Sequence, residues 1–197
     1  MNVSRETSER LAIFLALLEK WSPKINLVSA DSLKHSVDRH FRDSEQIARL
    51  RSVDGDRWID FGSGGGFPGA VIAIMKAAGE PDTTVTLVES DLRKATFLRT
   101  VSRETGVGFD VLAERIEALS PLGADVITAR ALAPLSILLG YADRHLSQGG
   151  TALFPKGRTW RKEVAEAEKT WRFTYHAHTS ETDPEAAILE IGGLSRA

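Results

Sequence analysis

A glycine-rich run constrains the fold of this chain more than any other feature of its sequence. The run covers residues 60–69 and reads Asp-Phe-Gly-Ser-Gly-Gly-Gly-Phe-Pro-Gly. Residues 57–59 before it are short, apolar and β-prone, and residues 70–78 after it are helix-forming. Glycines let a ligand approach the backbone closely, and the first turn of the following helix offers unpaired N–H groups. The run therefore predicts a strand, a ligand-binding loop and a helix, as in nucleotide-binding α/β folds.

The spacing of the glycines separates two classes of nucleotide ligand. In the dinucleotide pattern Gly-x-Gly-x-x-Gly, a start at Gly62 places the bulky Phe67 at the last position, where close helix packing needs a small residue. A start at Gly64 matches the pattern but places Pro68 inside the loop. Asp60 followed by x-Gly-x-Gly-x-Gly instead resembles the first motif of S-adenosylmethionine (SAM) methyltransferases. In that motif the acid anchors the loop and the methionine end of the cofactor, and the glycines admit the cofactor's backbone-like portion.

Composition places the chain among ordinary globular proteins and limits its chemistry. Its 197 residues suffice for one α/β domain with a small extension. Cysteine is absent, which excludes disulfides, a thiolate nucleophile and zinc–thiolate sites. No long apolar run or signal-peptide pattern is present, so we expect a cytoplasmic protein without a membrane partner. The net charge of −2 means that any contact with RNA must come from a local basic patch.

Strand-like and helical segments alternate after the glycine run. We expect strands at 57–59, 84–89, 108–112, 124–129, 149–154, 172–179 and 186–192, and helices at 92–105, 132–146 and 159–170. The last two strands are too close in sequence for a helical crossover, so one of them is reversed or they are not neighbours. We therefore predict a Rossmann-like SAM methyltransferase fold with a mostly parallel seven-stranded sheet and one antiparallel strand, over residues 53–197.

Residues 1–52 are predicted to form an N-terminal helical extension. Apolar residues recur at helical spacing over residues 4–20, where Trp21 and Pro23 should end the helix. A second helical region spans about residues 30–50, and its periodicity shifts near Arg42, which predicts a break there.

Candidate cofactor residues follow the ends of the expected strands, where ligands bind in such sheets. Glu89 ends the second strand and could accept hydrogen bonds from two ribose hydroxyls, which both NAD and SAM possess. Ile116 and Glu117 follow the third strand, where methyltransferases surround adenine. Arg130 follows the fourth strand and flanks the expected methyl-donor pocket. Each assignment has a structural alternative. Glu89 could be an acid that stabilises a helix N-terminus, Ile116 and Glu117 could pack as ordinary loop residues, and Arg130 could form a structural ion pair.

Basic residues in two segments are candidates for RNA contact. Residues 156–162 carry four basic side chains at the start of a helix, where cations oppose the helix dipole. Phosphate contacts, with a base stacked on the indole, would explain this pattern, although a charged surface turn would too. The N-terminal helices carry a second basic group. This group could contact phosphates, or it could be a solvated helix face. The candidates are Lys24, Arg39, His40, Lys156, Arg158, Trp160 and Arg161. The closely spaced His176 and His178 lack further ligands, so we expect no metal site.

Taken together, these motifs resemble the bacterial 16S rRNA guanine-N7 methyltransferase G family, also called glucose-inhibited division protein B. The resemblance extends over nearly the whole chain and rests on Trp21, 25–27, His40, 43–44, 60–69, 89–90, Lys94, 97–99, 129–131 and 156–157. Gly65 stands where many members have alanine. The resemblance implies that Gly62, Phe67, Ile116, Glu117 and Arg130 contact SAM and that Glu89 holds its ribose. With Asp60, Gly64 and Gly66 of the glycine run, these residues form the predicted SAM site.

The same resemblance implies methylation of N7 of guanine 527 in 16S rRNA, with the RNA, the 30S subunit or its precursor as the partner of a monomer. Guanine N7 has a free lone pair, so no catalytic base is expected, and Arg130 is a candidate for positioning. A nicotinamide-dependent oxidoreductase is one alternative, although Tyr141 is followed by Arg144 and His145 instead of a Tyr-x-x-x-Lys motif. A non-catalytic ribosome-binding protein with a SAM fold is the other alternative.

Overall fold

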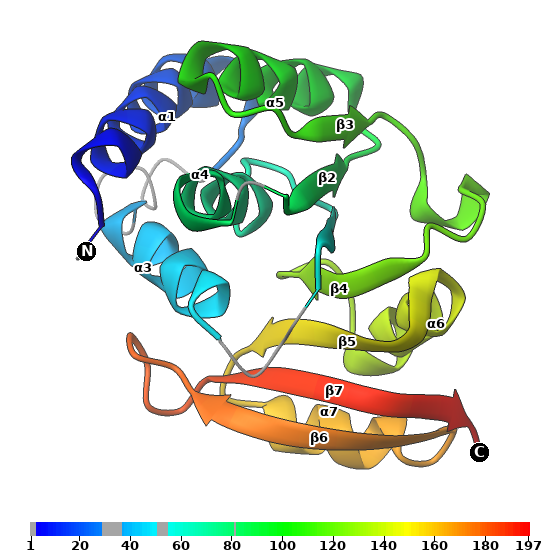
Figure 1. The fold of residues 1–197 in the computed structure, drawn as a ribbon. Helices are drawn as coiled ribbons and strands as arrows, with labels where there is room; N and C mark the ends of the chain where they lie inside the picture. The colour runs from blue at the N-terminus through cyan, green and yellow to red at the C-terminus, as the bar shows by residue number, and fades with distance from the viewer. Residues whose placement is uncertain (1–2, 29–36, 51–54, 81) are drawn as a thin grey trace.

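A seven-stranded sheet with helices on both faces forms the protein (Figure 1). The computed structural model describes residues 3–28, 37–50, 55–80 and 82–197. The strands are β1 (Arg57–Phe61), β2 (Thr84–Val88), β3 (Asp110–Leu112), β4 (Ala124–Ala129), β5 (Leu146–Lys156), β6 (Trp171–Thr179) and β7 (Ala187–Arg196). The helices are α1 (Arg5–Ile25), α3 (Val37–Ala48), α4 (Gly69–Gly79), α5 (Leu92–Thr105), α6 (Leu135–His145) and α7 (Trp160–Ala167), with a short 3₁₀ helix at Ile116–Ala118.

The strand order β3-β2-β1-β4-β5-β7-β6 confirms the predicted fold class. Strands β1 to β5 pair in parallel, whereas β7 pairs antiparallel with both β5 and β6. In the described part of the chain, β7 is therefore the one reversed strand, as predicted. The chain proceeds outward from β1 to β3 and then returns to β4 on the other side of β1. This switch point opens a crevice beyond the carboxyl ends of β1 and β4.

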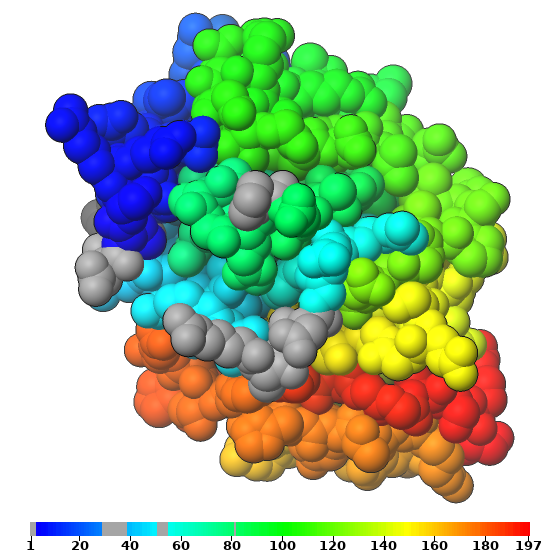
Figure 2. All heavy atoms as spheres, viewed as in Figure 1, coloured from blue at the N-terminus to red at the C-terminus, as the bar shows by residue number. Residues whose placement is uncertain are grey.

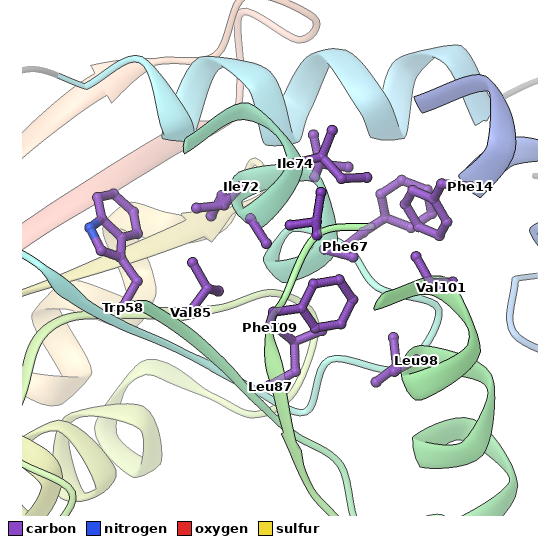
Figure 3. Packing of buried hydrophobic residues seen from close by; sticks show 14 of the residues in the cluster. Phe14, Trp58, Phe67, Ile72, Ile74, Val85, Leu87, Leu98, Val101 and Phe109 are labelled. Atoms are coloured by element: carbon purple, nitrogen blue, oxygen red, sulfur yellow. The ribbon is translucent and has the colours of Figure 1, made fainter. Parts of the chain in front are cut away.

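Two hydrophobic clusters cover the two faces of the sheet. One cluster joins α4 and α5 to the N-terminal helices, and Figure 3 shows Phe14 of α1 beside Phe67 of the glycine loop (residues 62–69). The other cluster joins α6 and α7 to the opposite face. The N-terminal helices thus share a core with the sheet. The predicted boundary between residues 52 and 53 lies outside the described residues, so the division into two domains stays a prediction.

Two predictions about the N-terminal helices were wrong. Helix α1 continues past Trp21, contains Pro23 and ends at Ile25. The capping residue Asn26 has a left-handed backbone (φ 52°), and its N–H donates to the Ser22 carbonyl. A proline in the last turn removes only one helical donor, so the turn persists. Helix α3 runs through Arg42 without the predicted break. Residues 29–36 of the second predicted helical region lie outside the described residues.

Strand boundaries differ from the prediction at the C-terminal end of the sheet. Strand β5 begins at Leu146 instead of residue 149, and its register against β4 shifts between Ala124 and Val126. The strand contains an irregularity near Gly149, which has φ +82°. No helix among the described residues is long and apolar enough to cross a membrane.

Candidate active site

Two neighbouring cavities lie at the carboxyl ends of β1 and β4. The glycine-loop cavity has a volume of about 280 Å³ and extends along the first glycines toward the 3₁₀ helix. The α3 cavity has a volume of about 600 Å³ and lies between α3, the chain after β4 and β5, and residues 180–188. Ala131 and Leu132, which directly follow β4, line both cavities. A molecule in one cavity would therefore lie next to a molecule in the other.

The conformation of the glycine loop depends on positions that lack a side chain, of which Gly62 and Gly66 are the clearest. Gly62 and Gly66 have φ values of +65° and +91°. A Cβ atom at Gly62 would lie 2.6 Å from Cδ1 of Leu132, and one at Gly66 would lie 2.9 Å from Cζ of Phe14. Gly62 and Gly64 line the glycine-loop cavity, whereas Gly66 packs against the core beneath the loop.

Asp60 holds the loop from below. Its Oδ1 accepts a hydrogen bond of 2.7 Å from Thr128 Oγ1, and its Oδ2 accepts one of 3.3 Å from the Gly69 N–H. The carboxyl group is buried, and burial raises its pKa to about 6. Asp60 thus ties the end of β1 to β4 and to the start of α4. It lines neither cavity, so its contact with the methionine end of the cofactor stays a prediction.

Glu89 places a carboxylate against the glycine-loop cavity. Its Oε2 accepts a hydrogen bond of 2.9 Å from the Gly64 N–H, and its Oε1 accepts one of 2.8 Å from the Asp91 N–H. An ionised carboxylate has about four acceptor sites, so two backbone bonds leave room for two hydroxyl donors. Together with the closely approaching backbone of Gly64, this donor set fits the ribose of a nucleoside cofactor.

The 3₁₀ helix forms the far wall of the same cavity. It brings the buried Ile116 and the more exposed Glu117 to the cavity, where we predicted adenine contacts. Tyr141 of α6 donates a hydrogen bond of 2.5 Å to Glu117 Oε1, which lowers the pKa of Glu117 and raises that of Tyr141. Sequence reasoning did not place Tyr141 or Lys94 on this cavity. Lys94 belonged to the family motif, but no local signal predicted that Tyr141 pairs with Glu117.

Arg130 connects the α3 cavity to the N-terminal extension. Its Nη1 donates to Nδ1 of His40 at 2.9 Å and lies 3.9 Å from Asp43 Oδ2, and its Cζ lies 5.3 Å from the ring centroid of Phe67. Because arginine stays protonated, His40 must accept through Nδ1 and carry its proton on Nε2. Burial and the charge of Arg130 lower the pKa of His40 to about 4. Arg130 lines the α3 cavity, and its cofactor contact stays a prediction.

Phe67 points away from both cavities and into the core. Its ring lies 5.3 Å from Phe14 and 5.1 Å from Phe41, measured between centroids, and its residue is 5% exposed. The side chain therefore joins the glycine loop to the N-terminal helices. Its predicted contact with SAM stays a prediction.

The predicted basic segment after β5 is mostly engaged within the protein. Lys156 donates to Glu163 Oε2 and to the Ala133 carbonyl, each at 2.9 Å, and its side chain is 9% exposed. The predicted base stacking on Trp160 does not fit the structure, because its residue is 8% exposed and Arg161 covers its ring at 4.2 Å. The helical spacing of Trp160, Val164 and Ala167 was the signal for this buried face.

The other RNA candidates have accessible side chains. Arg158 is exposed and lies 3.2 Å from Glu185, measured between Nη2 and Oε2. Arg39 of α3 pairs with Asp183 at 3.1 Å and lines the α3 cavity. Lys24 is exposed in the last turn of α1 and lines neither cavity. Their contact with RNA stays a prediction.

The closely spaced histidines of β6 contact each other and an acid. The rings of His176 and His178 lie 4.4 Å apart, and Nε2 of His178 lies 2.6 Å from Glu190 Oε2. Within the described ranges, no group of three or more potential metal ligands is present.

Comparison with solved structures identifies the fold. A SAM-dependent methyltransferase from Aquifex aeolicus superposes with a TM-score of 0.61 at 12% identity, over 90% of this chain and 97% of that one. The N-methyltransferase NodS from Bradyrhizobium japonicum WM9, solved with S-adenosyl-L-homocysteine, gives a TM-score of 0.55 at 13% identity, over 90% and 96% of the two chains. The strand order, the glycine loop and the ribose-type carboxylate agree with this fold. The chain therefore has the fold of the SAM-dependent methyltransferases.

Sequence relatives identify the family. The family described as rRNA small subunit methyltransferase G matches residues 7–187. A ribosomal RNA small subunit methyltransferase G from Ruegeria pomeroyi is 54% identical over 196 residues, which cover 100% of this chain and 96% of that protein. The protein of the same name from Paracoccus denitrificans is 49% identical and is covered completely. The chain belongs to the rRNA small subunit methyltransferase G family, which confirms the resemblance and replaces the nicotinamide-dependent alternative. It is therefore a SAM-dependent methyltransferase, and SAM is its cofactor.

Proposed function

We propose that this protein transfers the methyl group of SAM to N7 of guanine 527 in 16S rRNA. It acts as a monomer on the RNA, on the 30S subunit or on a precursor of that subunit. The observation that carries this proposal is the contact between the two cavities at Ala131 and Leu132. A cofactor in the glycine-loop cavity would meet a base in the α3 cavity across these two residues. Family membership supports small-subunit rRNA as the source of that base.

The residues of the glycine-loop cavity suit the parts of SAM. Glu89 has two acceptor sites left for the ribose hydroxyls after its two backbone hydrogen bonds. Ile116 offers an apolar wall for adenine, and the glycine loop admits the amino-acid portion. When bound, SAM supplies an electrophilic methyl group on a positively charged sulfur.

Alignment is the main contribution that the protein makes to this reaction. The N7 lone pair of guanine is free at neutral pH, so no residue has to remove a proton from it. Holding the two reactants in line can lower the barrier by about 7–11 kcal/mol. Arg130 is hydrogen-bonded to His40, lies near Asp43 and directly precedes the wall that the two cavities share, which suits a positioning role.

Methyl transfer to ribosomal subunits tests the proposal directly. We expect purified protein to transfer labelled methyl groups from SAM to 30S subunits from a strain that lacks the protein. Mass spectrometry of the 16S rRNA should then locate the new methyl group on N7 of guanine 527. Transfer to another nucleotide would refute the target. SAM binding without any transfer to 30S subunits, free 16S rRNA or assembly precursors would favour a non-catalytic ribosome-binding protein.

A further inference from the structure

The α3 cavity has walls of balanced charge. Its described lining residues include three cations and three carboxylates, namely Arg39, Arg130, Lys156, Asp43, Glu163 and Asp183. The closest pairs are Arg39 with Asp183 at 3.1 Å and Lys156 with Glu163 at 2.9 Å. Leu132 and Ile188 add apolar surface. A cavity whose cations are already matched by carboxylates suits a neutral ring with polar edges better than it suits a phosphate group.

Asp43 differs from the other carboxylates in how its oxygens are used. Its Oδ1 accepts a hydrogen bond from the Thr182 hydroxyl. Its Oδ2 lies 3.9 Å from Nε of Arg39 and 3.9 Å from Nη1 of Arg130, which is beyond hydrogen-bond distance. No described residue donates a hydrogen bond to Oδ2. The side chain is 19% exposed and lines the cavity, so this oxygen, which has no donor among the described residues, can accept hydrogen bonds from a molecule bound there.

The two remaining carboxylates are more firmly committed to protein partners. Asp183 accepts from Arg39 through one oxygen and from the Glu185 N–H through the other. Glu163 has one oxygen without a donor in the described chain, but its charge is committed to the nearly buried ammonium of Lys156. Asp43 also lies beside Arg130, which directly precedes the wall shared with the glycine-loop cavity.

We propose that the α3 cavity receives the target base and that Asp43 reads its Watson–Crick edge, accepting hydrogen bonds from N1–H and the N2 amine of guanine. This inference rests on the proposed function. Guanine presents two adjacent donors at this edge, whereas adenine presents an acceptor beside its amine, so the carboxylate discriminates between the two purines. N7 lies across the ring from this edge. Binding the edge at Asp43 therefore leaves N7 free to face the shared wall at Ala131 and Leu132.

The charge of Asp43 also suits the reaction itself. The N7 lone pair forms the new C–N bond, and the electron pair of the broken C–S bond stays with sulfur. The positive charge passes from sulfur to the purine ring, and no proton leaves. A carboxylate at the edge of that ring stabilises the charge as it develops, because electrostatic interactions are strong in a partly dehydrated site.

Inosine at the target position tests this inference. Inosine keeps N7 and N1–H but lacks the N2 amine, and it can be placed in 16S rRNA by ligation before 30S reconstitution. We expect the wild-type protein to methylate the inosine substrate with a kcat/KM roughly tenfold or more below that for guanine, as for a lost hydrogen bond to a charged group. Equal kcat/KM values of the wild-type protein on the guanine and inosine substrates would overturn the proposal. This measurement requires no protein variant.

The variant Asp43→Asn tests the residue. Asparagine can still accept the Thr182 hydrogen bond, so we expect normal SAM affinity by calorimetry. We expect the guanine substrate to lose about tenfold or more in kcat/KM, and the guanine-to-inosine ratio to fall close to one. A ratio that stays at the wild-type value would show that another residue reads the base.

Glu181→Gln is the matched control. Glu181 pairs with Arg49 at 3.1 Å on the same α3–loop contact but does not line the cavity, so its variant should keep the wild-type ratio. Complete lack of transfer by the wild-type protein to guanine-bearing subunits would refute the proposed function instead, whereas transfer without discrimination would refute only the role of Asp43.

Discussion

Gly62 is the residue at which a single added atom should disturb the cofactor site most. Its φ of +65° disfavours any side chain, and a Cβ would lie 2.6 Å from Leu132. We expect Gly62→Asp to weaken SAM binding by more than about tenfold, because the side chain would also put a charge into the cavity. Titration calorimetry measures this. Gly79→Ala is the control, since a Cβ there meets nothing within 4 Å, and normal binding by the Gly62 variant would refute the loop assignment.

Glu89 tests the ribose contact at the same scale. We expect Glu89→Gln to weaken SAM binding by roughly 10- to 100-fold, as for the loss of a charge-assisted hydrogen bond. Glu114→Gln is a matched control, because Glu114 lines the same cavity and accepts no hydrogen bond from a described residue. Equal effects of the two substitutions in calorimetry would argue against a specific ribose contact at Glu89.

His40 should make stability depend on pH. Its pKa falls to about 4 in the folded protein, below the usual 6.5, so the unfolded chain binds more protons between these values. Its contribution to stability is therefore full above pH 6.5 and is lost as pH falls toward 4. Asp60 acts in the opposite direction over a similar range, since burial raises its pKa to about 6. Only a comparison with a variant isolates the effect of His40.

We expect the urea midpoint of the wild type to fall more between pH 6.5 and 4 than that of His40→Asn, in which asparagine can still accept from Arg130. Parallel pH profiles of the two proteins would contradict the assignment of a neutral His40.

At the scale of elements, the two basic residues at the turn between β5 and α7 differ in exposure. Lys156 is nearly buried and pairs with Glu163, whereas Arg158 is exposed. We expect Arg158→Glu to weaken RNA binding and to flatten its dependence on salt, leaving SAM affinity intact, because each lost phosphate contact reduces the slope by about one. Lys169→Glu reverses an exposed charge just beyond α7 as a control. Equal salt slopes for both variants in filter binding would remove this turn from the RNA interface.

Helix α3 and the loop between β6 and β7 contact each other beside the α3 cavity. Gln46 accepts from the Glu181 N–H at 3.0 Å, and Arg39 pairs with Asp183. Figure 2 shows the cyan atoms of α3 close above the orange atoms of this C-terminal region. The contacts between them are largely polar, and they form one side of the α3 cavity. The N-terminal extension thus builds part of the site that the sheet alone would leave open.

At the scale of the whole molecule, the shared core predicts that the extension and the sheet unfold together. Phe14 is fully buried and packs against Phe67 and Phe41. We expect Phe14→Ala to lower the free energy of unfolding by about 3–5 kcal/mol in one cooperative transition. The adjacent Ile13 is 40% exposed, so Ile13→Ala should cost much less. Two separate calorimetric transitions would instead support an independent N-terminal domain.

Local patterns in the sequence were enough to predict the fold class, and they placed most of the candidate cofactor residues at the carboxyl ends of the strands. The glycine run, the alternation of strands and helices and the short link before β7 each depend on neighbouring residues, and backbone conformation is largely a local property. The bounds of α5 and β4 therefore agree with prediction. The end of α1 was missed because packing of its last turn outweighs the cost of Pro23.

Only the tertiary structure decided which side chains meet. Tyr141 donates a hydrogen bond to Glu117, which lies 24 residues away in the sequence. Lys156 is nearly buried because α7 places Glu163 beside it. Asp43 and Thr182 come together across 139 residues because α3 packs on the end of the reversed strand pair. Sequence periodicity predicts the face on which a residue lies, but its partner depends on the order of strands and the packing of layers. For this reason the sequence by itself determined a SAM methyltransferase fold, whereas the α3 cavity emerged only from the folded chain.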